Sequence, residues 1–236
     1  MSFRVLGIIP ARGGSKGVPR KNIRLVAGRP LIAYTIEATK DSKLLTYFVT
    51  STDDAEIASI AERLGSPVLI RPSRLAADDT PMVLVVDHAL RVLEPDMGRF
   101  DYVVVLQPTT PLRTGGDIDA ALILLIESGA DSVVSVYEVG DHHPARMYRL
   151  IEGRLVPYEQ EPTDRLRQRL PPVYHRNGAI YACRRALIED GTLIGPDTRP
   201  YIMPRERSIN IDDELDLAFA DFLFRRQQSE FNSKSS

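Results

Sequence analysis

The chain has 236 residues, of which 43% are hydrophobic and 26% are charged. At about 100 to 200 residues per domain, this length suits one large domain or a domain with a smaller lobe, and the hydrophobic fraction excludes a disordered chain. Lysine and arginine number 30 and the acidic residues 32, which gives a formal net charge of -2. This balance excludes a general nucleic-acid binder, because such a protein needs a basic excess to neutralise phosphates.

Two features of the sequence bear on the location of the protein. The single cysteine, Cys183, cannot form a disulfide framework within the chain, and this cysteine usage is typical of reducing compartments. No stretch approaches the ~18 consecutive apolar residues of a transmembrane helix, and Pro10 and Arg12 interrupt the apolar run near the start. We expect a soluble cytoplasmic protein that binds neither membranes nor nucleic acid.

The first 136 residues alternate short apolar runs with amphipathic patterns. Between the runs, apolar residues recur with helical spacing from Ile57 to Leu64 and from Ile118 to Leu125. Thr80 and Pro81 form a good N-cap and first-turn pair for a further helix. The apolar runs predict buried strands at residues 5–9, 47–50, 68–70, 102–106 and 132–136. Strands alternating with helices predict an α/β fold with a largely parallel sheet.

This rhythm is interrupted at residues 137–176, which are rich in Pro, Arg and His and show no regular stripe. The segment is too apolar for a solvated linker, so we expect a lobe or an interface arm. A strand at 179–182 follows, and then a last amphipathic helix with a stripe formed by Leu215, Ala218, Phe219 and Phe222. The predicted organisation is an α/β domain at 1–136 and 177–226, an inserted lobe at 137–176 and a flexible polar tail at 227–236.

The most informative stretch directly follows the first predicted strand. It reads Ile9-Pro10-Ala11-Arg12-Gly13-Gly14-Ser15-Lys16-Gly17-Val18-Pro19-Arg20-Lys21-Asn22. Its glycines let backbone N–H groups approach a ligand closely, and its basic side chains supply positive charge beside them. In open α/β sheets, ligands bind beyond the carboxyl ends of the strands, which is where this loop begins. The combination predicts a site for a polyphosphate.

Plainer interpretations of these residues stay open. The loop lacks the G-x-x-x-x-G-K-[ST] spacing of a P-loop and the G-x-G-x-x-G spacing of a dinucleotide site, so a glycine turn with solvated basic side chains is the alternative. His142-His143 lacks a Cys or a third His at ligand spacing, which argues against a metal site there. Asp53-Asp54 mainly predicts a helix cap, with a ligand-facing role for Asp53 left open.

The glycine-rich loop resembles the signature of the acylneuraminate cytidylyltransferases, the CMP-sialic acid synthetase family, and the likeness continues along nearly the whole chain. Arg71-Pro72-Ser73-Arg74-Leu75-Ala76 resembles the family's arginine loop, and Gln107-Pro108-Thr109-Thr110-Pro111-Leu112-Arg113 resembles its Q-P-T-S-P-L-R loop. Arg167-Gln168 with Leu170-Pro171 resembles its R-Q-x-L-P run, and Asn177-Gly178-Ala179-Ile180-Tyr181 its N-G-A-I-Y strand. The resemblance implies a three-layer α/β/α, Rossmann-like nucleotidyltransferase fold of the glycosyltransferase-A type, with a mainly parallel sheet and a small dimerisation lobe.

The resemblance also assigns residues to two substrates. The residues that match the CTP pocket are Ala11, Arg12, Gly13, Gly14, Ser15, Lys21, Asn22, Arg71 and Thr80. The residues that match contacts to an acidic sugar are Gln107, Arg167, Asn177 and Tyr181. Arg12 and Lys21 match groups that hold the triphosphate, as cations of both kinds can. Because Arg167 matches a residue that a second subunit donates, a homodimer is implied, in which the lobe completes the neighbouring active site.

The implied reaction is Mg²⁺-dependent attack of a sugar's anomeric hydroxyl on the α-phosphate of CTP, which gives the CMP-sugar and pyrophosphate. The sugar would be a sialic-acid-like nonulosonate, that is N-acetylneuraminate or a bacterial relative such as legionaminate or pseudaminate. Arg12, Lys21 and Asp212 would be the catalytic residues. Ser208-Ile209-Asn210-Ile211-Asp212-Asp213-Glu214-Leu215-Asp216-Leu217 resembles the family's D-I-D-x-E-L-D-L, so Asp212 and Asn210 would hold the metal. Asn210 replaces an aspartate of the family, which removes one formal charge from the site.

Two alternatives to this function stay open. The first is a sister nucleotidyltransferase for another acidic sugar, such as Kdo, or for another nucleotide, although G-G-S-K-G differs from the P-A-R-x-x-S-x-R-L-P-G-K of the Kdo enzymes. The second is a nucleotide-binding module that has lost turnover. Asn210 favours this second alternative, and the presence of Arg12, Lys21, Asp212 and Arg167 argues against it.

Overall fold

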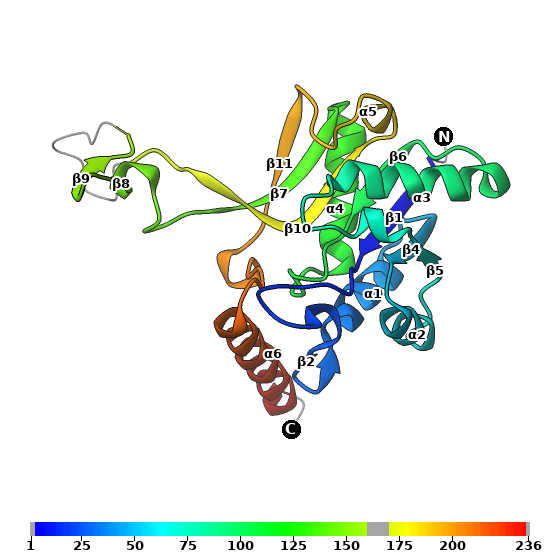
Figure 1. The fold of residues 1–236 in the computed structure, drawn as a ribbon, viewed down its shortest axis with the longest axis horizontal. Helices are drawn as coiled ribbons and strands as arrows, with labels where there is room; N and C mark the ends of the chain where they lie inside the picture. Colours follow the sequence, from blue (N-terminus) through cyan, green and yellow to red (C-terminus); the bar gives the residue numbers. More distant parts are fainter. Residues whose placement is uncertain (1–2, 160–169, 235–236) are drawn as a thin grey trace.

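In the computed structural model, which describes residues 3–159 and 170–234, a seven-stranded sheet forms the centre of the molecule (Figure 1). Its order is β11-β7-β10-β6-β1-β4-β5, and within it β10 alone runs antiparallel to its neighbours. The strands are β1 (Val5–Pro10), β4 (Tyr47–Thr52), β5 (Val68–Ile70), β6 (Tyr102–Val105), β7 (Ser132–Glu138), β10 (Tyr174–Arg184) and β11 (Thr198–Ile202). The predicted mainly parallel sheet is confirmed. Sequence periodicity misses β11, because this edge strand carries polar residues and a proline.

Helices cover both faces of the sheet, which confirms the three-layer arrangement. Alternate residues of β1 point to opposite faces. Ile9 packs with α1 (Leu31–Asp41) and α2 (Ala55–Arg63), and Val5 packs with α4 (Gly115–Ser128). Leu6 and Ile8 pack with α3 (Met82–Met97) and α5 (Ala186–Glu189) on the other face. The carboxyl ends of the parallel strands are left free at one edge of these layers.

The predicted helix cap at Asp53-Asp54 is confirmed, and the predicted cap at Thr80 is wrong. The Asp54 carboxylate caps α2 by accepting from the backbone N–H groups of Glu56 and Ile57, and Gly129 ends α4 with a φ of 68°. Helix α3, however, begins at Met82 and has Pro81 in extended conformation at its N-cap. Thr80 therefore does not cap this helix, and its hydroxyl donates instead to the Arg74 carbonyl at 3.2 Å.

The last helix, α6 (Glu214–Lys234), buries a different face from the predicted one. Leu217 and Ala220 pack against α1 and the small β2–β3 ladder (Leu25–Val26 and Arg29–Pro30), whereas Leu215, Phe219 and Phe222 are more than half exposed. The expected tail from residue 227 is also helical as far as Lys234. No helix in the described parts of the chain is both long and apolar enough to cross a bilayer.

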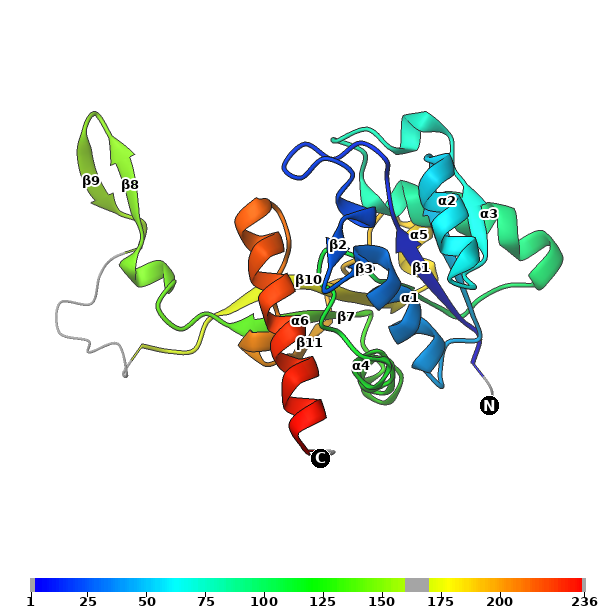
Figure 2. The same cartoon turned by 90° about the horizontal axis from the view of Figure 1, so that it is seen from below.

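The described part of the interrupting segment forms an arm, which we define as residues 139–159 and 170–173. It leaves the sheet where the β7–β10 ladder ends, and its described part carries a hairpin of β8 (Tyr148–Ile151) and β9 (Arg154–Pro157). Glu152 and Gly153 both have positive φ, at 50° and 77°, as a two-residue hairpin turn requires. Figures 1 and 2 both show the hairpin standing away from the body. Sequence periodicity does not reveal it, because apolar residues lie on both of its faces.

Candidate active site

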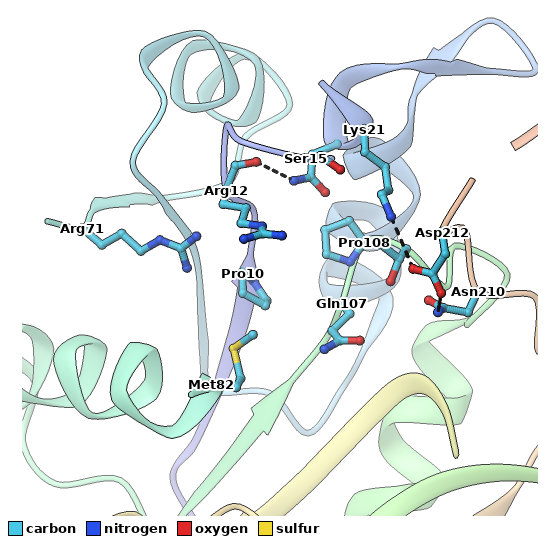
Figure 3. Close-up of a pocket in the computed structure, with 12 residues that line it drawn as sticks. Pro10, Arg12, Ser15, Lys21, Arg71, Met82, Gln107, Pro108, Asn210 and Asp212 are labelled. Carbon is cyan, nitrogen blue, oxygen red and sulfur yellow. Dashed lines mark hydrogen bonds and ion pairs between the residues drawn. The ribbon is translucent and has the colours of Figure 1, made fainter. Parts of the chain in front are cut away.

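An open cavity of about 260 Å³ lies where β1, β5 and β6 end (Figure 3). Four of the residues lining it, Pro10, Met82, Pro108 and Thr109, were not assigned from the sequence. The assigned residues that line it are Arg12, Ser15, Lys21, Asn22, Arg71, Gln107, Asn210 and Asp212. These side chains come from loops that are far apart in the sequence and converge because the parallel strands all end at one edge.

Two of the three glycines in the first loop, Gly13 and Gly17, leave no room for a side chain. A Cβ on Gly13 would lie 2.6 Å from the Asp54 carboxylate, and one on Gly17 would lie 2.1 Å from the Asp212 carbonyl oxygen. Ala11 is buried in the core and donates its N–H to Ser51, so it offers neither its side chain nor its N–H to a ligand. Gly14 has open space around its Cα, which leaves room for a ligand there.

Lys21 links this loop to the segment that carries the expected metal ligands. Its Nζ donates to the Ile211 carbonyl at 2.6 Å and lies 3.4 Å from Asp212 Oδ1. Asn210 Nδ2 donates to the other Asp212 oxygen at 2.6 Å. Asn22, which follows Lys21, links the end of the loop to its start, because its Nδ2 donates to the Arg12 carbonyl at 3.0 Å. The carboxylate of Asp212 therefore has two donors and faces the cavity with most of its surface exposed.

Arg71 is buried in the cavity wall and is paired with Asp53. Its Nη2 lies 3.7 Å from Asp53 Oδ1, which also accepts the Gly13 N–H at 3.2 Å. Burial lowers the pKa of Arg71, and the nearby Asp53 opposes this effect. Within the described residues the Nε of Arg71 has no hydrogen-bond partner. Asp53 thus supports Arg71 and the glycine-rich loop from behind the cavity wall, whereas its neighbour Asp54 is the predicted helix cap.

Arg12, which lines the cavity, and Lys16 meet at a single carboxylate, that of Asp78. Arg12 Nη1 lies 2.5 Å from Asp78 Oδ1, and Lys16 Nζ lies 2.5 Å from Asp78 Oδ2. Hydrogen bonds from Lys16 and then from Arg12 lower the pKa of Asp78. Arg12 lines the cavity, and a third of its side chain is exposed.

The residues assigned to the sugar divide into two groups. Gln107 lines the cavity, and a Cβ on the neighbouring Gly178, whose φ is 79°, would lie 2.8 Å from its Oε1. Asn177 is 2% exposed and its amide is used internally, since Oδ1 accepts from Ser135 Oγ and the Ala179 N–H while Nδ2 donates to Ser208 Oγ. The Asn177 amide therefore supports the loops around it, and the predicted contact of this residue to a sugar stays a prediction.

Other assigned residues lie outside this cavity. Tyr181 is half-buried against the core on the α3 side of the sheet, and burial raises the pKa of its phenol. Thr80 does not line the cavity either. Arg167 lies outside the described residues.

Two buried charged residues behind the cavity hold its loops, and neither was singled out from the sequence. Arg113 donates to the carbonyls of Gln107 at 3.2 Å and Ala179 at 2.7 Å, and burial lowers its pKa to about 9. Asp117, in the first turn of α4, accepts from Arg207 Nη2 at 3.0 Å and from the Tyr201 hydroxyl at 2.8 Å. Their long-range partners could not be read from local patterns.

The chemistry of the cavity is divided between its walls. Arg12 and Arg71 lie on one side of the cavity, Lys21 lies beside Asp212 and Asn210 on the other side, and Gln107 presents a neutral polar group between them (Figure 3). No cluster of three or more His, Cys, Asp or Glu side chains suited to a metal occurs in the described parts of the chain. The arrangement suits a polyphosphate that brings its own oxygen ligands to a cation.

Comparison with known proteins agrees with the motifs. Residues 6–188 match the model of a family described as Cytidylyltransferase. The chain is 35% identical over 230 residues to a protein of Legionella pneumophila named CMP-N,N'-diacetyllegionaminic acid synthase, with 96% of this chain and 98% of that protein covered. It is 32% identical over 223 residues to the pseudaminic acid cytidylyltransferase of Campylobacter jejuni, with 93% and 96% covered.

A solved structure of similar fold is a CMP:2-keto-3-deoxy-manno-octonic acid synthetase complexed with CTP, which superposes with a TM-score of 0.71 at 15% sequence identity. The match covers 95% of this chain and 99% of that one. At this identity the likeness concerns the fold alone. The family model and the two relatives together show that the chain belongs to the cytidylyltransferase family.

Proposed function

We propose that this protein transfers CMP from CTP to the anomeric hydroxyl of a sialic-acid-like nonulosonate and releases pyrophosphate. The observation that carries the proposal is the convergence of Arg12, Lys21 and Asp212 on one cavity, although Lys21 and Asp212 are 191 residues apart in the chain. The names of the relatives, which refer to legionaminic and pseudaminic acids, support the class of sugar. We assign the reaction to the cytoplasm, since the single cysteine is a buried free thiol.

The residues of the cavity would work by positioning and by charge neutralisation. Arg12 and Lys21 would bind the triphosphate, with Lys21 held in place by its hydrogen bond to Ile211. Arg71 would donate its unpaired Nε to a neutral acceptor on the nucleoside, because its own charge is already paired with Asp53. Gln107 would hydrogen-bond the sugar hydroxyls. No covalent bond to the protein is needed, because the hydroxyl attacks phosphorus directly and pyrophosphate leaves.

The donor set fits Mg²⁺, which proteins typically hold with one or two carboxylates while substrate phosphates and waters fill the remaining positions. Asp212 supplies one carboxylate on the exposed wall, and the Asn210 amide can supply a neutral oxygen beside it. When bound, the ion would offset negative charge that develops on the departing phosphates. The site has one carboxylate fewer than the family pattern.

Replacing Asn210 with aspartate is expected to lower the Mg²⁺ concentration that gives half-maximal activity. The new carboxylate would lie beside Asp212, where a cation between them relieves their repulsion. Titrating Mg²⁺ against pyrophosphate release measures this requirement. The exposed Asp213→Asn variant, which alters charge outside the cavity, serves as the control. An unchanged or raised requirement in Asn210→Asp would show that Asn210 does not face the metal.

The proposed reaction is tested by mixing the protein with CTP, Mg²⁺ and a panel of 2-keto-3-deoxy sugar acids and measuring pyrophosphate. Release with nonulosonates and not with Kdo is the expected result. Release with Kdo alone would identify the sister activity. Binding of CTP without release across the whole panel would favour a module without turnover.

We further propose that the protein forms a homodimer through the arm. Leu150 and Leu155 on the hairpin are 74% and 69% exposed, and an isolated two-stranded hairpin is marginally stable in water. A cavity of about 450 Å³ lies between the root of the arm and the exposed side of α6, lined by Phe219 among others, and it shares Asn210 and Asp212 with the first cavity. The apolar hairpin of a second copy would pack on Phe219 and Leu223 at this otherwise polar cavity and bring residues next to the active site.

A Leu150→Lys, Leu155→Lys double variant is expected to be monomeric and to lose at least about tenfold in activity, because two charges oppose burial of the hairpin. Sedimentation equilibrium compares its mass with that of the unaltered protein, which should be twice that of one chain. Ile123→Lys, an exposed change on α4, is the matched control and should remain dimeric. A monomeric unaltered protein with full activity would contradict the proposal.

A further inference from the structure

The carboxylate of Asp78 forms ion pairs with two cations of the glycine-rich loop. Asp78 follows η2 (Ser73–Leu75) on the loop after β5, and its two oxygens each meet a different cation, Arg12 and Lys16, at 2.5 Å. This is the contact that two oxygens of a phosphate group would make with the same side chains. The adjacent Asp79 makes no ion pair within the described residues.

The other cations near the cavity have separate partners. Lys21 is held by Ile211 and Asp212, and Arg71 is paired with Asp53. Arg12 and Lys16 thus share a single negative charge, so the pair keeps one excess positive charge. Because Asp78 and Lys16 are 42% and 84% exposed, these contacts can open without disturbing the core.

We propose that Asp78 is a displaceable counter-ion that competes with the phosphates of the nucleotide for Arg12 and Lys16. The inference rests on the proposed function, in which Arg12 binds the triphosphate. CTP displaces the carboxylate on binding, because a polyphosphate carries several charges and an exposed ion pair is weak. When pyrophosphate leaves, the Asp78 carboxylate returns to the two cations and favours its release.

This competition has a specific signature. It weakens the binding of every ligand that needs Arg12 and Lys16, including CTP and pyrophosphate, and it leaves a ligand without phosphates unaffected. A purely structural role for Asp78, as a tie that orders the loop around Arg12, predicts the opposite, since loss of the tie would then weaken CTP binding.

The test is calorimetric titration of the full-length protein with CTP, inorganic pyrophosphate and cytidine, for the unaltered chain, Asp78→Asn and Asp79→Asn. Asp78→Asn is expected to bind CTP and pyrophosphate about two- to fivefold more tightly, as loss of a competing exposed ion pair allows, and to bind cytidine with an unchanged Kd. Asp79→Asn should bind all three like the unaltered chain.

Unchanged or weaker binding of CTP and pyrophosphate by Asp78→Asn would overturn the inference while leaving the proposed function intact. Tighter binding by Asp79→Asn to the same extent would also overturn it, because the effect would then come from net charge alone. Failure of the unaltered chain to bind either CTP or pyrophosphate would overturn the proposed function and this inference with it.

Discussion

Replacing Lys21 with methionine is expected to lower kcat/KM for CTP by about 10²- to 10³-fold, the usual effect of removing one donor that stabilises developing charge. The Lys21 side chain is 12% exposed and its ammonium group lies at the junction of the glycine-rich loop and the Asp212 segment. Methionine keeps much of the length and the apolar stem of lysine but offers no charge to the phosphates. Initial rates of pyrophosphate release at varied CTP concentrations measure the loss.

Arg20→Met is the matched control for this prediction. Arg20 precedes Lys21 on the same loop, but its guanidinium pairs with Glu56 on α2 and does not line the cavity. We expect kcat/KM for CTP to change by less than about threefold in Arg20→Met, as for removal of an exposed ion pair. Equal losses in the two variants would show that the loop needs its overall charge and that Lys21 has no particular role.

Replacing Asp117 with asparagine is expected to lower the free energy of unfolding by about 2 kcal/mol, the size found for hydrogen bonds to a charged group, since Asp117 is buried but Arg207 is partly exposed. Asp117 is 4% exposed, closes the capping box of α4 with Thr114, and accepts hydrogen bonds from Arg207 and Tyr201. Asparagine keeps the shape but loses the charge that balances Arg207. Activity should fall as well, because Arg207 lies three residues before Asn210 in the chain.

The loss of stability in Asp117→Asn should depend on pH, because it follows the protonation of Asp117. Burial raises the pKa, but hydrogen bonds from Arg207, Thr114 and Tyr201 together lower it below the ordinary value. The stabilisation is therefore fully present above the unfolded-state pKa of about 4 and is lost as the pH falls through the folded-state value. Urea unfolding of the unaltered protein and of Asp117→Asn is measured at pH 7 and at pH 3 to 4. The difference between their free energies of unfolding should be smaller in acid. A constant gap would show that the charge of Asp117 is not what stabilises the fold.

Glu127→Gln, on the exposed side of the same helix, is the control for both measurements. Glu127 makes no ion pair within the described residues. The free energy of unfolding of Glu127→Gln should therefore lie within about 0.5 kcal/mol of that of the unaltered protein at either pH, as for ordinary surface substitutions. The comparison separates the contribution of the Asp117 contacts from a general effect of one fewer acidic residue.

The sequence by itself determined the layers of this protein and most of its strands. Runs such as Val5–Pro10 carry apolar residues on both faces. This pattern is typical of a strand that is covered on both sides, so it predicts a layer of helices on each face of the sheet. The glycine-rich loop could also be predicted to bind phosphates, because its charges and glycines are adjacent in the chain. Helix α2 with its Asp54 cap is a further case in which all the information is local.

Only the tertiary structure decided which polar groups remain available to a ligand. Asn177 and Gln107 both match sugar contacts in sequence, yet Ser135 and Ser208 take up the amide of Asn177 while Gln107 stays in the cavity wall. Asp53 and Asp54 are neighbours of the same type, but one caps a helix and the other faces Arg71. A side chain's hydrogen-bonding capacity is used up by partners distant in sequence, which local patterns do not record.

The same physical reason explains α6. Its sequence carries apolar residues on more than one face, and the predicted stripe through Leu215 and Phe219 was wrong because α1 and the β2–β3 ladder bury Leu217 and Ala220 instead. Which apolar face is buried depends on the surface that the rest of the fold presents to the helix. Periodicity within a helix therefore establishes that it is amphipathic, whereas long-range packing selects the face that becomes core and the face left for another molecule.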